Sequence, residues 1–67
     1  MQPVEKEGMS HYKKIHQDTA LRIGVLCKML EEVIDGTTNV KERLNLNKRL
    51  KMMRKKQAME LELANLL

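Results

Sequence analysis

The side chains of this chain that are able to do chemistry are few and scattered. His11 and His16 are five residues apart, about 140° around a helix, so they cannot hold one metal ion within a chain. Cys27 has no base among its helical neighbours, although a nucleophilic cysteine needs one to form its thiolate. We therefore interpret the histidines as surface or oligomer-contact residues and Cys27 as a small apolar residue at a helix contact.

The sequence also lacks the patterns that build known active sites. It has no glycine-rich phosphate loop, no Ser/His/Asp arrangement and no cluster with metal-ligand spacing. The acidic pairs Glu31/Glu32 and Glu60/Glu62 are, respectively, adjacent in sequence and directed to different helix faces. We expect a protein that is not an enzyme and needs no cofactor.

A run of basic residues is the main hint of a binding function. Residues 41–56 hold eight Lys or Arg residues and one acidic residue, Glu42, within a chain of net charge +4. One interpretation is a ridge that contacts the phosphates of nucleic acid without reading sequence, or that contacts an anionic protein surface. The other is a solvated helix face that keeps the protein soluble. The candidate anion-binding residues are Lys48, Lys51, Lys55 and Lys56.

A small anionic ligand such as a nucleotide is a third possibility. Tyr12 is the only aromatic residue apart from the two histidines, and its ring would stack on a base. The phosphates would then be held by one or more of Lys13, Lys14 and Arg22.

A short polar segment divides the chain into two helical patterns. Gly36 follows the last apolar residues of the first pattern, and we expect it to close that helix in the left-handed conformation. Asn39 lies three residues before Glu42, the spacing of an N-cap with a reciprocal carboxylate. We predict a flexible lead at residues 1–8, a helical hairpin at residues 9–67, helices at about 10–35 and 40–65, and a turn at 36–39.

Each predicted helix has an apolar stripe at spacings of three and four residues. The first stripe is Tyr12, Ile15, Thr19, Ile23, Leu26, Met29, Leu30 and Val33, and Gly24 lies on the opposite face. The second stripe is Leu46, Leu50, Met53, Gln57, Leu61 and Ala64. A turn this short places the two helices side by side and antiparallel.

More apolar residues remain than one neighbouring helix can cover. The candidate oligomer or partner contacts off the main stripes are Leu21, Val25, Met52, Met59, Leu63 and Leu66. A chain of 67 residues with one cysteine is marginal as a monomer and needs another support. We therefore expect an all-α protein whose hairpins assemble as a homo-oligomer, most simply a dimer that forms a four-helix bundle.

The leading functional hypothesis follows by subtraction. A short chain without catalytic residues but with excess apolar helix surface is typical of a regulator that binds another macromolecule stoichiometrically, as an inhibitor or adaptor does. Non-specific nucleic-acid binding and nucleotide binding stay open as alternatives. No apolar run approaches the roughly 20 residues that cross a bilayer, so we expect no membrane partner and a cytoplasmic location.

Overall fold

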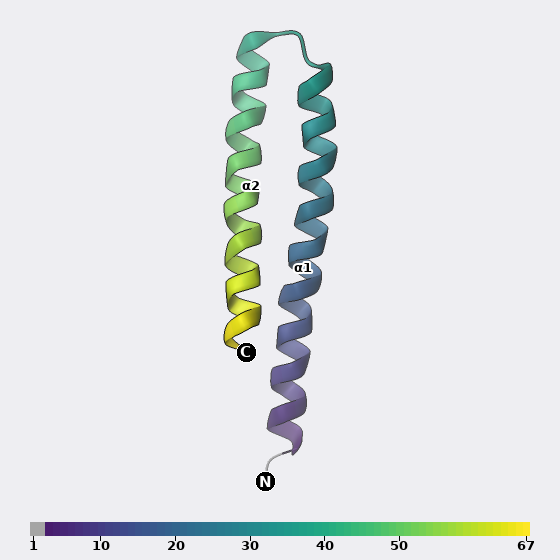
Figure 1. Cartoon of the computed structure of the whole chain (residues 1–67), viewed down its shortest axis with the longest axis vertical. Helices are drawn as coiled ribbons and strands as arrows, with labels where there is room; N and C mark the ends of the chain where they lie inside the picture. Colours follow the sequence, from purple (N-terminus) through teal and green to yellow (C-terminus); the bar gives the residue numbers. More distant parts are fainter. Residues whose placement is uncertain (1–2) are drawn as a thin grey trace.

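The chain folds into two long helices that lie side by side in opposite directions (Figure 1). The computed structural model describes the backbone of residues 3–67 and the side chains of residues 10–67. Helix α1 spans Pro3–Gly36 and helix α2 spans Val40–Leu66. The molecule measures 59 × 14 × 10 Å, so it is a rod two helices wide. The all-helical antiparallel hairpin predicted from the sequence is confirmed.

Helix α1 begins earlier than the sequence pattern indicated. It starts at Pro3 instead of near residue 10, and its first turns extend past the C-terminal end of α2 (Figure 1). Proline suits a first helical position because its fixed φ is helical and its missing N–H needs no partner there. The flexibility expected for residues 1–8 stays a prediction, and residues 1 and 2 lie outside the described residues.

The end of α1 corrects the role predicted for Gly36. Gly36 has no positive φ, so it is an ordinary last helical residue and not a left-handed cap. The next residue closes the helix instead. The Thr37 N–H donates to the Ile34 carbonyl at 3.1 Å, and the Thr37 hydroxyl donates to the Val33 carbonyl at 2.7 Å. These two bonds satisfy carbonyls that a helix end otherwise leaves unpaired.

The start of α2 agrees with the predicted cap. Asn39 has extended backbone angles, and its side-chain oxygen accepts a hydrogen bond from the Glu42 N–H at 3.2 Å. That bond satisfies one free donor of the first turn and fixes where α2 begins. The reciprocal contact of the Glu42 carboxylate stays a prediction.

The contact between the helices is a narrow seam that combines small and polar side chains with larger apolar ones. In α1 the seam residues are spaced by four and three: His16, Ala20, Ile23, Cys27, Leu30 and Ile34. In α2 they follow the same spacing: Leu46, Leu50, Met53, Gln57, Glu60 and Ala64. This is the heptad spacing of helices that pack along their whole length. Ala20 and Ala64 are the most deeply buried of the core residues, at 2% and 1% exposed.

The seam differs from the predicted stripe mainly in α1. Ile23 and Leu30 face α2 as expected, but Leu26, Met29 and Val33 are exposed. Cys27 is buried at the helix contact, as its interpretation as a small apolar residue required. In α2 the stripe was nearly right, with Glu60 in the seam where Leu61 had been expected.

None of the helices, over the residues that the structure describes, combines the length and apolar character needed to cross a membrane.

Candidate protein-binding surface

One half-buried hydrogen-bonded pair of side chains lies in the seam toward the C-terminal end of α2. His16 Nδ1 and Glu60 Oε2 are 2.5 Å apart, and their side chains are 28% and 18% exposed. The sequence analysis had placed His16 on the surface or at an oligomer contact. That interpretation is wrong for the hairpin itself, because His16 occupies a seam position and pairs across it. The repeating seam spacing, extended back from Ala20, was the signal that pointed to it.

Gln57 makes a second polar contact across the seam. Its Nε2 donates to the backbone carbonyl of Ala20 at 3.1 Å. The same nitrogen lies 2.8 Å from the position that a Cβ on Gly24 would occupy. Gly24, predicted on the face opposite the stripe, is therefore half-buried beside α2, and its lack of a side chain makes room for Gln57.

A third contact pairs Glu31 of α1 with Arg54 of α2. One member of the basic run is therefore already paired within the hairpin. A shallow cavity of about 310 Å³ lies along this side and is lined by Gly24, Cys27, Lys28, Glu31, Arg54 and Gln57.

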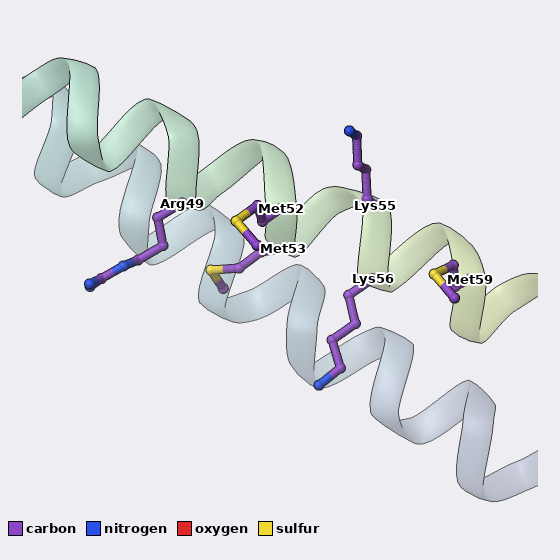
Figure 2. A pocket seen from close by; sticks show the side chains of 6 residues that line it. All are labelled: Arg49, Met52, Met53, Lys55, Lys56 and Met59. Atoms are coloured by element: carbon purple, nitrogen blue, oxygen red, sulfur yellow. The ribbon is translucent and has the colours of Figure 1, made fainter.

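The other basic residues of the run point to solvent. Lys48, Lys51, Lys55 and Lys56 are all exposed on α2, as an anion-binding ridge or a solvated face requires. Residues 48, 51 and 55, spaced by three and four, share one face of α2, whereas residue 56 lies about 100° around the helix from residue 55. Figure 2 shows Lys55 and Lys56 extending in opposite directions from the helix.

Between these two lysines lies a groove with an apolar floor. It has a volume of about 510 Å³ and is lined by Arg49, Met52, Met53, Lys55, Lys56 and Met59 (Figure 2). Met52 and Met59 are 72% and 61% exposed, so their side chains face solvent along the groove. All the lining residues come from α2, which makes this groove a property of one helix face. The sequence analysis had named Met52 and Met59 as contacts but had not placed them beside Lys55 and Lys56.

The groove continues into an apolar stripe toward the end of the chain. Met52, Met59, Leu63 and Leu66, spaced by seven, four and three residues, form what we call the α2 stripe. Every member is exposed, including Leu66. Residues at these spacings share one face of a helix, so the stripe is continuous for the length of α2 from the groove onward.

Helix α1 presents an exposed apolar stripe of its own. Ile15, Leu26, Met29 and Val33, which we call the α1 stripe, are spaced by eleven, three and four residues and are all exposed. Arg22 lies at the position between Ile15 and Leu26 that continues the spacing. Leu21 and Val25, predicted to be exposed in a lone hairpin, are exposed as well, on another part of the α1 circumference.

The residues proposed for nucleotide binding are spread around and along α1. Tyr12, Lys13, Lys14 and Arg22 are all exposed, and successive helical residues point about 100° apart. The Tyr12 ring has the His11 ring as a neighbour, with centroids 6.1 Å apart. Among the side chains that the structure describes, no group of His, Cys, Asp and Glu is placed to hold a metal ion.

Comparison of the chain with protein-family models, with curated proteins and with solved structures finds no match. The functional argument therefore rests on the chain's own surface.

Proposed function

We propose that this protein is a small non-enzymatic regulator that self-associates and acts stoichiometrically by binding another protein. The observation that supports this proposal is the contrast between the seam and the outer surface. Among the described residues the seam buries five apolar side chains, Ala20, Ile23, Cys27, Ile34 and Ala64, while the large apolar residues of the α1 and α2 stripes remain in solvent. Contiguous exposed apolar surface of this kind is typical of interaction sites in proteins of this size.

Self-association is assigned to the α1 stripe. Burying a Leu, Met or Val side chain stabilises an assembly by about 1.5–3 kcal/mol each, so two copies of the stripe provide ample driving force for pairing. A dimer that places α1 against α1 joins the four helices of two hairpins in one assembly. Each α1 then packs against its own α2 and the α1 of the other copy, and each α2 keeps its outer face free.

The oligomeric state tests this part of the proposal. Sedimentation velocity on the wild-type protein should show a dimer that dissociates on dilution. The variant Leu26→Ser/Met29→Ser should be monomeric and still helical, because both side chains lie outside the seam. Leu44→Ser is the matched control, since Leu44 is equally exposed but lies on α2 away from both stripes. A wild-type protein that sediments as a monomer at all concentrations contradicts the proposal.

The regulator part requires a protein partner bound at a fixed ratio. Capture from an extract of the source cells, followed by titration of the purified partner, should saturate at a simple ratio of partner to hairpin. Met52→Ser/Met59→Ser should weaken that binding while the dimer persists. Recovery of the protein alone, with no stoichiometric partner, would contradict the proposal that it is a regulator.

We also propose a cytoplasmic site of action, which fits the single free thiol of Cys27.

Non-specific nucleic-acid binding is the second candidate, supported by the exposure of Lys48, Lys51, Lys55 and Lys56. Such binding releases counterions, so its affinity falls steeply as salt rises. A titration with a random-sequence duplex at about 50 mM salt tests it. Lys48→Glu/Lys55→Glu should abolish the binding and leave the hairpin folded.

Nucleotide binding has less support, because the residues proposed for it point in different directions from α1. Calorimetry with a panel of nucleotides tests it.

A further inference from the structure

We infer that the groove on α2 binds an acidic amphipathic helix of the partner protein. This inference rests on the proposed function and names the chemistry of the partner. The site consists of the groove-lining residues, with the α2 stripe as its continuation toward Leu66. The partner segment lies along α2, its apolar side on the methionines and its carboxylates beside the basic residues.

The floor of the groove selects an apolar surface. Met52, Met53 and Met59 line it, and two of the three are largely exposed. Methionine has an unbranched, polarisable side chain that adapts to different apolar shapes, which makes it common on surfaces that accept helices. A purely polar or phosphate ligand leaves this floor uncovered, so the floor distinguishes a protein partner from a nucleic acid.

The rim selects negative charge on both sides of that apolar surface. Figure 2 shows Lys55 extending from one side of the methionines and Arg49 and Lys56 extending from the other. On α2 the acidic residues nearest to them are Glu60, one turn after Lys56 and already in contact with His16, and Glu42, about two turns before Arg49. A partner helix therefore needs acidic residues flanking its apolar stripe on both edges.

The length of the surface sets the length of the partner segment. Met52 and Leu66 are fourteen residues apart on α2, which corresponds to about 21 Å along the helix axis. A partner helix of about four turns covers that distance. Its apolar residues recur at spacings of three and four, as in other helices that bind in grooves.

A second copy of this chain is a poor occupant of the groove. Its own groove is rimmed by Arg49, Lys55 and Lys56, so pairing one groove with another brings like charges together. Two of its acids, Glu31 and Glu60, are already paired within the hairpin. Charge complementarity therefore favours a different, acidic chain on α2 and leaves the second copy to α1.

Designed peptides test the inference on the full-length protein. The probe is an alanine-based helical peptide of about 20 residues with leucines at spacings of three and four and glutamates on both flanks. The comparison peptide keeps the leucines and replaces every glutamate by lysine. Fluorescence anisotropy should show binding of the acidic peptide, weakening with salt, and no binding of the basic one.

Two charge-reversal variants locate the binding site. Arg49→Glu should lower the affinity for the acidic peptide about fivefold or more, since it removes one ion pair and introduces a repulsion. Lys51→Glu is the matched control, because it makes the same change of net charge on an exposed residue outside the groove. Its effect should be much smaller. Met52→Ser/Met59→Ser should lower the affinity for the acidic peptide without changing the salt dependence of its binding.

Equal binding of the acidic and basic peptides overturns the inference. So does an equal effect of Arg49→Glu and Lys51→Glu, because binding would then follow overall charge and not the groove. Binding of a duplex that the acidic peptide cannot displace from residues 49–59 overturns it in favour of nucleic acid. Sedimentation of the same samples distinguishes failure of this inference from failure of the proposed function. If Arg49→Glu remains a dimer and no longer binds the acidic peptide, both the proposed function and the inference are supported. If the protein is a dimer but binds the acidic and basic peptides equally, only the inference is overturned.

Discussion

Gln57 on α2 donates a hydrogen bond to the backbone carbonyl of Ala20 on α1, across the seam and at 3.1 Å. The bond exists because Gly24, one turn further along α1, has no side chain where the amide of Gln57 lies. A glycine that costs a helix about 1 kcal/mol relative to alanine thus makes room for a polar contact between the helices. The pair fixes the register of α1 against α2 at this level of the hairpin.

Gly24→Ala should change the free energy of unfolding little by itself but considerably when Gln57 is also replaced. The alanine gains about 1 kcal/mol of helix propensity and loses about the same through the Gln57 bond, since the amide must move. In a Gln57→Ala background the steric conflict is absent, so Gly24→Ala should stabilise by about 1 kcal/mol. Urea unfolding of the four proteins at one concentration measures this coupling. Additive effects of the two substitutions would contradict it.

Gly36→Ala should stabilise the hairpin. Gly36 has no positive φ, and a Cβ at this position meets nothing within 4 Å. Alanine reduces the freedom of the unfolded chain, so the free energy of unfolding should rise by about 0.4–1 kcal/mol. Thermal unfolding followed by circular dichroism is the measurement. A loss of stability instead would show that Gly36 adopts the left-handed conformation in solution.

Asn39→Ala should destabilise the hairpin by about 1 kcal/mol, because the Glu42 N–H loses its acceptor at the start of α2. Thr38→Ala is the matched control, since Thr38 is the neighbouring residue with a capping side chain and the structure assigns the cap to Asn39. Urea midpoints of the two variants should differ. Equal loss in both would mean that the cap is shared between the two positions.

Glu60→Ala should destabilise by about 1 kcal/mol, the typical net contribution of a hydrogen bond of this kind. The partner left behind, His16, remains in the seam without its acceptor. Glu62→Ala removes the same charge from an exposed position two residues away and should have little effect. Urea unfolding separates the two variants, and similar stabilities would show that the pair with His16 contributes nothing.

The sequence predicted the architecture well because its strongest local signals are also the structural ones. Two periodic segments and a four-residue polar break lead directly to a hairpin, and the Asn39–Glu42 spacing identifies the start of α2. The end of α1 was predicted in the right place for the wrong reason. Hydrogen bonds of Thr37 close the helix, whereas the prediction had assigned the closure to the neighbouring Gly36.

The facing side of α1 was not predictable from apolar size. Ranking side chains by hydrophobicity favours Leu26, Met29 and Val33, whereas the packed side carries Ala20, Cys27 and the polar His16. The packing is decided by the seam residues of α1 and α2, which follow the same spacing of four and three. The polar seam residues His16 and Gln57 have partners on the opposite helix. Those pairings, and the meeting of methionines with lysines in one groove, depend on three-dimensional register, which a single helix pattern does not contain.

The burial of Cys27 has a practical consequence for measuring how the hairpin moves. Cys27 is the only cysteine of the chain and is 5% exposed in the middle of the seam. Because Cys27 is nearly buried, a thiol reagent should react with it faster when the two helices separate locally, so the labelling rate reports that opening without any substitution in the chain. A bound partner that slows the labelling stabilises the packed hairpin. A bound partner that accelerates the labelling favours separation of the two helices.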